Sequence, residues 1–253
     1  MDLRGKVVAI TGGGRGIGRA MALAFAGKGA HVALLDLNVQ DMQTTQAQCE
    51  ALGVRSLSHS CNVARETDVA TALDNVIASL GRLDVLINNA GITKDALLVK
   101  VKDGQVVGKM SLEQWQSVID VNLTGVFLCT REAVARMIQL GNGGCIISLS
   151  SISRAGNVGQ SNYGATKAGV VAMTSGWAKE LSRYKIRTGA IAPGFTRTDI
   201  LDAMKPEILD RMLEAVPARR LAEPTEMAHA ALFIAENDYF SGRVLELDGG
   251  LRL

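Results

Sequence analysis

The sequence predicts an α/β domain in which helices cover both faces of a doubly wound parallel sheet. Three observations support this prediction. Short apolar runs alternate with amphipathic stretches, most of the runs are apolar throughout, and the links between them are short. Continuous apolarity is typical of strands covered on both faces, and strand–helix alternation favours a parallel sheet. Because we find no repeat, linker or composition shift, we expect a single domain over residues 1–253.

The expected strands and helices alternate along the chain. Strands are expected at residues 7–10, 32–35, 85–87, 146–149 and 244–247. The first helical period consists of Ile17, Ala20, Met21, Ala24 and Phe25, and the second contains Val69, Ala72, Leu73, Val76, Ile77 and Leu80. Residues at these spacings lie on one face of a helix, and that face packs on the sheet.

One segment departs from this alternation. Asp103 and Gly104 lie between alternating residues in the stretch Val99–Val107, which predicts a β-hairpin inserted near residues 97–109. Two interpretations stay open. The hairpin is a surface feature without function, or it is a lid element beside a pocket.

Composition excludes several classes of protein. Apolar residues make up 47% of the chain and charged residues 21%, as in globular proteins. The net charge of +2, without a long run of Lys or Arg, does not indicate a nucleic-acid partner. The N-terminus lacks the apolar core of a signal peptide, and no apolar run approaches the roughly 18–20 residues that span a bilayer. We therefore expect no membrane partner and a cytoplasmic location.

The cysteines and histidines do not predict a metal site. None of their spacings matches a metal-ligand pattern. The cysteines are Cys49, Cys61, Cys129 and Cys145, and the histidines are His31, His59 and His229. We expect buried, reduced thiols and structural histidines.

A glycine-rich turn follows the first expected strand and opens the first helix. The stretch Thr11–Gly18 reads TGGGRGIG. Glycines permit a tight turn and let a pyrophosphate approach the backbone, where the helix N-terminus offers N–H groups. The pattern alone is weak in a chain with 27 glycines, but its place between strand and helix predicts a dinucleotide site. The candidate residues are Gly12, Arg15, Gly16, Ile17 and Gly18.

The coenzyme preference depends on two side chains. Asp36 ends the second expected strand, about 20 residues beyond the glycines, where a carboxylate binds ribose hydroxyls and repels a 2′-phosphate. Arg15 favours the opposite preference, because a guanidinium pairs with a phosphate. We expect NAD(H), with NADP(H) as the alternative.

Further motifs carry a family resemblance over nearly the whole chain. They are Thr11–Gly18, Asn88-Asn89-Ala90-Gly91, Asn122, Ser150-Ser151, Tyr163-x-x-x-Lys167, Pro193-Gly194 and Asp248-Gly249-Gly250. Together they resemble the short-chain dehydrogenase/reductase family, and the chain is most similar to its 3-oxoacyl-[acyl-carrier-protein] reductase-like group. The resemblance implies a Rossmann-like fold with about seven parallel strands, usually assembled as a homotetramer.

The chemistry of Tyr163 and Lys167 can also be argued directly. A free phenol has a pKa near 10, so base strength near pH 7 needs a shift of about 3 units, roughly 4 kcal/mol. A nearby ammonium favours the phenolate and typically shifts a pKa by about 1–3 units. Because residues four apart lie on the same helix face, Lys167 is expected one turn from Tyr163 and is expected to lower its pKa.

The resemblance also implies a role for each candidate catalytic residue. Tyr163 is the acid/base, Lys167 lowers its pKa and holds the nicotinamide ribose, and Asn122 holds a water in the proton relay. A serine polarises the carbonyl. Ser151 takes the place of the family's second strand-end serine, whereas the usual spacing to the tyrosine selects Ser150. We choose Ser151.

Other residues are implied in cofactor binding by the same resemblance. Pro193, Gly194, Thr196 and Thr198 resemble the clamp on the nicotinamide carboxamide, with the Thr196 N–H and Thr198 hydroxyl as donors. Asn89, Ala90 and Gly91 pass under the adenosine, unless they form a plain strand-end turn. The remaining pair is Asn62 and Val63. Asn62 replaces the family's usual Asp, and we expect it to accept the adenine hydrogen bond.

An apolar segment near residues 195–215 is expected to form a substrate lid. Its apolar residues are Ile200, Leu201, Met204, Ile208, Leu209, Met212 and Leu213. Such a lid suits an acyl chain or hydrophobic alcohol, although the same pattern suits core packing. Lys179 is compatible with an acidic acyl carrier protein, whereas the uncharged stretch Leu140–Gly144 and the Asp36 carboxylate are not typical of carrier-using reductases.

We therefore expect an NAD(P)(H)-dependent oxidoreductase that transfers hydride between nicotinamide and a carbonyl or secondary alcohol, with a 3-oxoacyl thioester as the favoured substrate. The alternatives are an NAD-dependent dehydrogenase of another secondary alcohol and a non-catalytic dinucleotide-binding sensor. A serine hydrolase is disfavoured, because no G-x-S-x-G motif surrounds Ser150, Ser151 or Ser161.

Overall fold

A computed structural model describes residues 1–198 and 206–251, and its main feature is a seven-stranded parallel sheet. The strand order is β3-β2-β1-β4-β7-β8-β9. The strands are β1 (Val7–Thr11), β2 (His31–Asp36), β3 (Ser56–Ser60), β4 (Val85–Asn88), β7 (Gly144–Leu149), β8 (Ile186–Pro193) and β9 (Arg243–Leu247). This architecture confirms the predicted fold class.

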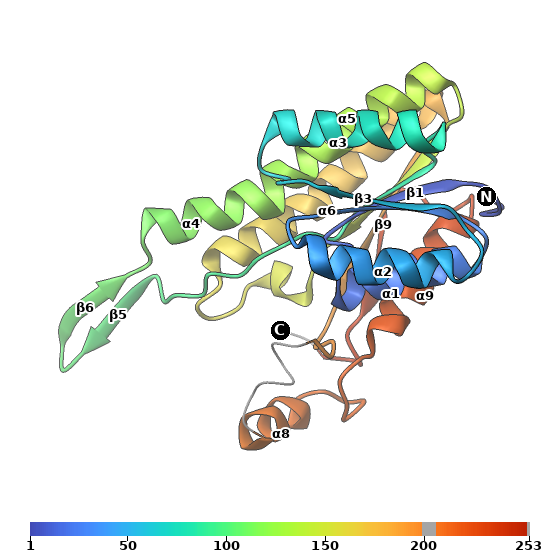
Figure 1. The fold of residues 1–253 in the computed structure, drawn as a ribbon. Coiled ribbons are helices and arrows are strands. Elements are labelled where there is room, and N and C mark those ends of the chain that lie inside the picture. The colour runs from blue at the N-terminus through green and yellow to red at the C-terminus, as the bar shows by residue number, and fades with distance from the viewer. Residues whose placement is uncertain (199–205, 252–253) are drawn as a thin grey trace.

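Helices cover both faces of the sheet (Figure 1). One face carries α1 (Gly16–Gly27), α2 (Val39–Glu50) and α9 (Pro224–Glu236), and the other carries α3 (Glu66–Leu80), α5 (Gly125–Leu140) and α6 (Ser161–Leu181). Strand β1 shows why both faces are apolar. Its Val8 and Ile10 belong to the core beneath α1 and α9, whereas Val7 and Ala9 belong to the core beneath α3 and α5. Successive side chains of a strand point to opposite faces, so a strand between two layers must be apolar throughout.

The five strands expected from apolar runs lie within β1, β2, β4, β7 and β9. Two strands had no such signal. Strand β3 reads SLSHS and lies at the edge of the sheet, where polar residues are tolerated. In β8 the apolar run is interrupted by Arg187, Thr188 and Gly189.

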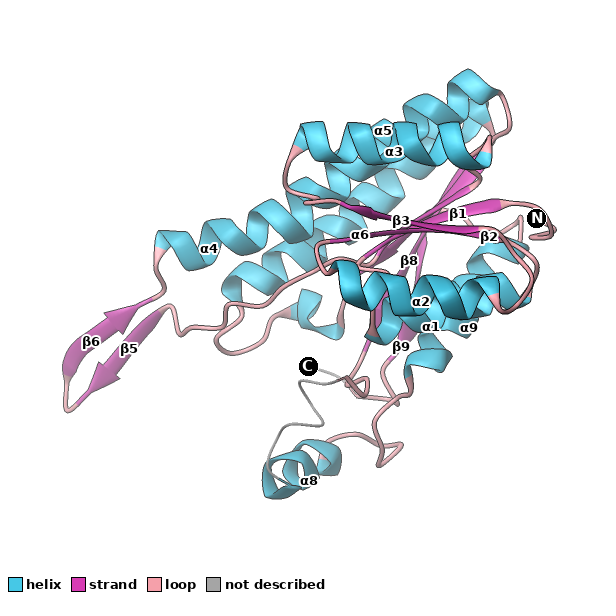
Figure 2. Cartoon of the chain, viewed as in Figure 1, coloured by secondary structure: helices cyan, strands magenta, loops and turns pink. Residues whose placement is uncertain are grey.

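The hairpin expected near residues 97–109 is formed by β5 (Val99–Lys102) and β6 (Gln105–Lys109). These strands make a separate two-stranded sheet that projects from the body of the molecule (Figure 2). The chain returns through α4 (Leu112–Ile119), which begins with a capping box between Ser111 and Gln114. A π-helical turn, η1 (Asp120–Thr124), then joins α4 to α5.

The expected lid falls only partly within the described residues. Ile200, Leu201 and Met204 lie outside them, and α8 (Pro206–Glu214) is the helix that follows. Leu213 packs with Phe195 against a small cluster of buried residues, namely Ile152, Val216 and Leu251. The end of α8 is therefore attached to the strand-end segments beside it.

The four cysteines are free and buried, as expected. Burial raises the pKa of the Cys49 and Cys61 thiols to about 11, so neither thiol is a ready nucleophile. Within residues 1–198 and 206–251, no group of three His, Cys, Asp or Glu side chains is arranged to hold a metal ion. No helix in the described part of the chain is long and apolar enough to cross a membrane.

Candidate active site

The carboxyl ends of the parallel strands meet at one edge of the sheet, where a cleft of about 550 Å³ lies. Ligands of open α/β sheets bind at this edge. The predicted dinucleotide residues that line the cleft are Gly12, Arg15, Gly16, Ile17, Asp36, Asn62, Val63, Asn89, Ala90, Gly91 and Thr198. It is also lined by residues that were not predicted, namely Leu35, Leu37, Asn38, Cys61, Ile92 and Val121. Most of these lie next to a predicted residue in sequence, and this adjacency was the available signal.

The glycine-rich turn brings the start of α1 to the cleft. Gly12 has φ +64°, a left-handed conformation that suits glycine. A Cβ atom at Gly18 would lie 2.0 Å from the Gly12 carbonyl oxygen, so Gly18 is needed for packing and is not a lining residue. Helix α1 begins without a side-chain cap and without an acidic residue in its first turn. Its N-terminal N–H groups and partial positive charge therefore fit an anionic group such as a pyrophosphate.

The turn after β4 is fastened to the glycine-rich turn. The Thr11 hydroxyl accepts the N–H groups of Asn89 at 3.0 Å and Ala90 at 3.1 Å. In return, the Asn89 side-chain amide donates to the carbonyls of Thr11 at 3.1 Å and Gly12 at 2.9 Å. Thr11 and the Asn89 side chain thus shape the floor of the cleft by linking two strand ends.

Asp36 is held rigidly at the end of β2. One carboxylate oxygen accepts the Gly14 N–H at 3.1 Å, and the other accepts the N–H groups of Leu37 at 2.7 Å and Asn38 at 3.2 Å. A carboxylate offers about four lone-pair sites, so these three bonds leave capacity for a ribose hydroxyl. The carboxylate lines the cleft, and its charge disfavours a phosphate there.

Asn62 has a structural bond of its own. Its side-chain oxygen accepts the Ala64 N–H at 3.0 Å, in a tight turn. A carbonyl oxygen has two lone pairs, so one remains for the hydrogen bond that the sequence predicts with adenine.

Tyr163 and Lys167 lie one turn apart on α6. The Lys167 side chain is buried, and its ammonium donates to the Leu149 carbonyl, at the end of β7, at 2.7 Å. A Cβ atom at Gly91 would lie 3.8 Å from this ammonium, so Lys167 faces the turn that lines the cleft. Burial lowers the pKa of Lys167 from 10.5 to about 8. An ammonium has three N–H groups, and one bond leaves two that fit ribose hydroxyls.

The expected lowering of the Tyr163 pKa is not what the protein alone produces. Burial raises the pKa of the half-buried Tyr163 phenol, because desolvation disfavours the phenolate. A hydrogen bond with the Ser151 hydroxyl acts in the opposite direction, and the charge of Asp95 raises the pKa further. Tyr163 is therefore a neutral phenol near pH 7.

The two candidate serines differ in their contacts. The Ser150 hydroxyl is buried and donates to the Lys167 carbonyl at 2.8 Å, so it is committed to α6. The Ser151 hydroxyl accepts the Ser153 N–H at 3.1 Å and lies within hydrogen-bond reach of Tyr163. The geometry thus places Ser151, the serine chosen from the sequence, beside the phenol.

Asn122 lies fully buried in the π-helical turn η1. Its side-chain oxygen accepts the Ile92 N–H at 2.8 Å, and its amide donates to the Ile92 carbonyl at 2.9 Å. A π-turn re-aims the side chains it contains, and such turns are frequent at functional sites. Asn122 thereby fixes the strand-end segment that continues from Gly91 into the cleft wall.

The predicted carboxamide clamp reaches the cleft at one residue, Thr198. Pro193 ends β8, the Gly194 N–H donates to the Leu247 carbonyl at 2.8 Å, and Thr196 forms an isolated bridge with Ala222. These three residues therefore anchor the segment that runs from the end of β8 to Thr198, and none of them is among the residues that line the cleft.

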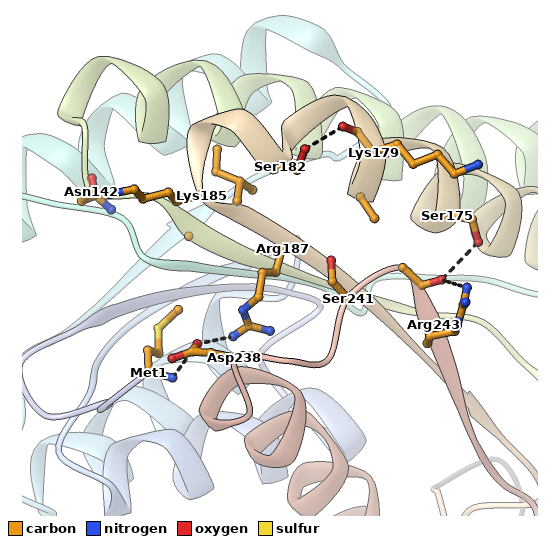
Figure 3. Close-up of a pocket in the computed structure, with 14 residues that line it drawn as sticks. Met1, Asn142, Ser175, Lys179, Ser182, Lys185, Arg187, Asp238, Ser241 and Arg243 are labelled. Atoms are coloured by element: carbon orange, nitrogen blue, oxygen red, sulfur yellow. Dashed lines mark hydrogen bonds and ion pairs between the residues drawn. The ribbon is translucent and has the colours of Figure 1, made fainter.

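A larger cavity of about 710 Å³ lies at the opposite edge of the sheet, where β7, β8 and β9 begin (Figure 3). The Arg187 guanidinium, which lines this cavity, already has hydrogen-bond and ion-pair partners within the protein. The Arg187 guanidinium donates to the Ile234, Ala235 and Phe240 carbonyls and pairs with Asp238 at 3.1 Å, and Asp238 also binds the Met1 amine. Lys179, which the sequence analysis considered for carrier docking, lines this cavity, but none of the predicted catalytic or cofactor-binding residues does, so we place the active site in the smaller cleft.

Comparison with known proteins identifies the family. Residues 12–252 match the family model described as enoyl-(acyl carrier protein) reductase. The chain is 40% identical to a 3-oxoacyl-[acyl-carrier-protein] reductase of Thermotoga maritima, over 99% of each chain. It is also 40% identical to a protein of the same description from Mus musculus, over 98% of each chain. The structure is similar to a short-chain type dehydrogenase/reductase from Mycobacterium marinum, with TM-score 0.87 and 31% identity over 98% of this chain and 96% of that one.

These matches cover nearly the whole chain. The chain belongs to the short-chain dehydrogenase/reductase family, as an oxidoreductase that acts on CH–OH groups with a nicotinamide dinucleotide.

Proposed function

We propose that this protein is an NAD(H)-dependent reductase of 3-oxoacyl thioesters, with the acyl group carried on an acyl carrier protein. The relatives named for this reaction match the chain over 97–99% of its length, which supports the substrate class. The observation that carries the proposal is the meeting of Ser151, Tyr163 and Lys167 beside a cleft shaped for a dinucleotide.

The proposed mechanism assigns proton delivery to Tyr163. A bound nicotinamide dinucleotide supplies the hydride. The Ser151 hydroxyl donates to the ketone oxygen and orients the carbonyl toward the phenol. As negative charge develops on that oxygen, Tyr163 donates its proton. The raised pKa of Tyr163 keeps this proton in place near pH 7, as the role of acid in a reduction requires.

Lys167 and Asn122 support this transfer. The Lys167 ammonium would hold the nicotinamide ribose of a bound coenzyme, and it stabilises the phenolate left on Tyr163 after the proton is donated. Asn122 holds a water on the path by which the phenol is reprotonated from solvent. Both side chains are buried and fixed by main-chain hydrogen bonds, so the geometry is set before substrate arrives.

The preference for NAD(H) rests on Asp36. Its carboxylate lines the cleft and is fixed by three backbone N–H groups, so it cannot turn away from a 2′-phosphate without losing them. Relatives of this description do not by themselves decide between the two coenzymes.

The part of the active site that holds the acyl chain of the substrate is proposed to be apolar. Ile152 follows Ser151 directly and packs with Phe195 and Leu213, so apolar side chains lie beside the reacting carbonyl. We assign the segment near residues 195–215 as a lid over the acyl chain, within a single domain of residues 1–253. We further propose a homotetramer that acts in the cytoplasm, where the four cysteines remain reduced.

The test is a substrate panel followed by the absorbance of the reduced nicotinamide. Purified protein is offered a 3-oxoacyl group on the carrier protein, the same acyl group on a small thiol, and simple ketones, each with NADH or NADPH. We expect the highest kcat/KM with the 3-oxoacyl thioesters and NADH. Efficient turnover of an unrelated secondary alcohol, with no thioester activity, would favour the dehydrogenase alternative. Dinucleotide binding without turnover of any substrate would favour a sensor.

A further inference from the structure

Gly14 lies in the turn between β1 and α1, and its carbonyl oxygen accepts hydrogen bonds from side chains of two helices. The Arg19 guanidinium, in α1, donates to it from Nε at 3.1 Å and from Nη2 at 2.9 Å. The Thr45 hydroxyl, in α2, donates to it at 2.7 Å and accepts a bond from the Arg19 Nε at 2.9 Å. Helices α1 and α2 lie side by side on one face of the sheet, so both donors reach the same acceptor (Figure 1). We call Arg19, Thr45 and the Gly14 carbonyl the clamp.

The Thr45 hydroxyl is not explained by the packing of α2. The buried residues of this helix are Met42, Thr45 and Cys49, and Thr45 is 0% exposed. A valine would fill the same position without burying a hydroxyl. A helical threonine commonly bonds to a carbonyl of its own preceding turn, as the neighbouring Thr44 does with Gln40 at 3.2 Å. Thr45 bonds instead to the glycine-rich turn, 31 positions away in the sequence.

The other side of Gly14 is bound to Asp36. The Gly14 N–H donates to the Asp36 carboxylate at 3.1 Å. A Cβ atom at Gly14 would lie 3.2 Å from the same carboxylate oxygen and 3.0 Å from the Cβ atom of Asp41, so Gly14 fills the space between the end of β2 and the start of α2. Because the N–H and the carbonyl of Gly14 share one Cα atom, fixing the carbonyl restricts the direction of the N–H. The clamp therefore acts on the Asp36 carboxylate through Gly14.

We propose that Thr45 and Arg19 are positioning residues for coenzyme selection, because their bonds to the Gly14 carbonyl keep the Gly14 N–H directed at Asp36. Neither side chain is among the residues that line the cleft, so each acts through the glycine-rich turn. The inference rests on the proposed function, in which Asp36 disfavours a 2′-phosphate. Loss of the clamp frees one carboxylate oxygen from its N–H donor, so the carboxylate can turn away from a 2′-phosphate and NADPH is disfavoured less.

The test compares the dissociation constants for NADH and NADPH, measured by fluorescence titration of the purified full-length protein without substrate. Thr45→Val removes the hydroxyl and keeps the shape of the side chain. Thr45→Ser keeps the hydroxyl and removes the methyl group. The matched control is Thr44→Val, because Thr44 is the exposed neighbour and its hydroxyl bonds within α2. Denaturant unfolding of each variant shows that it is folded.

The ratio of the NADPH dissociation constant to the NADH dissociation constant should fall in Thr45→Val. We expect a fall of about fivefold, which corresponds to one hydrogen bond of about 1 kcal/mol. Thr45→Ser and Thr44→Val should keep the wild-type ratio. Arg19→Lys is the second variant if Thr45→Val does not fold. It keeps the positive charge but loses the planar fork that donates twice to Gly14, so it should lower the ratio as well.

A double-mutant cycle with Asp36→Ala shows whether the effect passes through Asp36. Coupled residues give effects that do not add, whereas independent residues give effects that do. We expect Thr45→Val to change the ratio only while the Asp36 carboxylate is present. In the Asp36→Ala background, the ratios measured with and without Thr45→Val should be the same.

Three results would overturn the proposal. The first is a wild-type ratio in both Thr45→Val and Arg19→Lys. The second is an equal fall of the ratio in the Asp36→Ala background, since the clamp would then act on the turn and not through Asp36. The third is a Thr45→Ser ratio as low as that of Thr45→Val, which would assign the effect to packing of the methyl group. A wild type that binds NADPH more tightly than NADH would instead refute the proposed coenzyme preference, and the cycle would still report the coupling of Thr45 to Asp36.

Discussion

The Lys167 ammonium lies 5.4 Å from the centroid of the Tyr163 ring, one turn along α6. It is fixed there by its hydrogen bond to the Leu149 carbonyl at 2.7 Å. The sheet therefore positions the cation, and the helix positions the phenol relative to it. A charge held in this way stabilises a phenolate at the moment it forms, with little reorganisation.

The buried lysine should make stability depend on pH. The pKa of Lys167 is about 8 in the folded protein and 10.5 ordinarily, so the unfolded chain binds more protons between these values. Stability from this group therefore rises as the pH increases from about 8 to about 10.5, by about 3 kcal/mol. Below about pH 8 the buried Lys167 ammonium is charged, and its full desolvation cost lowers the stability of the folded protein. Lys167→Met removes this pH-dependent contribution to stability.

The measurement is the free energy of unfolding of the wild type minus that of Lys167→Met, at about pH 7 and about pH 10. Subtraction cancels the titration of the other tyrosines and the cysteines. We expect the difference to move in favour of the wild type at the higher pH. A difference that is the same at both pH values would contradict the buried, depressed lysine.

Alanine substitutions of the two serines should have different effects, with Ser151→Ala lowering activity and Ser150→Ala lowering stability. Ser151→Ala removes the hydroxyl next to Tyr163, and kcat should fall by about 10²–10³-fold, as when one donor to a developing oxyanion is lost. Ser150→Ala removes a buried bond to the Lys167 carbonyl, and the free energy of unfolding should fall by about 1 kcal/mol. Steady-state kinetics and denaturant unfolding of both variants check this. The opposite pattern would assign the role to Ser150.

Much of the fold could be predicted because its signals are local. A central strand such as β1 must be apolar at every position, and Asp36 ends β2 as expected. Strand β3 could not be predicted in this way, because an edge strand needs no apolar run. The placing of Tyr163 and Lys167 one turn apart on a helix, α6, was expected from their spacing in the sequence.

The site was less predictable wherever it depends on tertiary contacts. The direction of the Tyr163 pKa is set by desolvation, which no sequence spacing reports. The π-turn around Asn122 and the commitment of Ser150 to α6 arise from packing between elements that are distant in sequence. The roles of these residues stay predictions until they are tested.

The glycine-rich turn offers a matched pair of substitutions in α1. Gly18→Ala would place a Cβ atom 2.0 Å from the Gly12 carbonyl oxygen, which forces the turn to open. We expect loss of dinucleotide affinity, measured by fluorescence titration with NADH. Gly27→Ala meets no atom within 4 Å and should keep affinity while raising stability by roughly 0.5–1 kcal/mol. Equal affinities in the two variants would refute the close-packing argument.

Coenzyme choice should follow the charge at the end of β2. Asp36→Ala removes the carboxylate that lines the cleft and is proposed to bind the ribose, so the ratio of kcat/KM for NADH to that for NADPH should fall by about tenfold or more, equivalent to about 1.4 kcal/mol. Initial rates with both coenzymes give the ratio. A wild-type protein that already prefers NADPH would show that the assignment to NAD(H) is wrong.

The most direct test of the central claim uses Tyr163→Phe. This change removes the phenolic proton and keeps the ring near Lys167. Turnover of the best 3-oxoacyl substrate and the dissociation constant for NADH are measured on the same preparation. We expect turnover to fall by about 10²–10⁴-fold with the dissociation constant unchanged, because the variant loses its proton donor while the cleft stays intact. Turnover close to that of the wild type would contradict proton delivery by Tyr163.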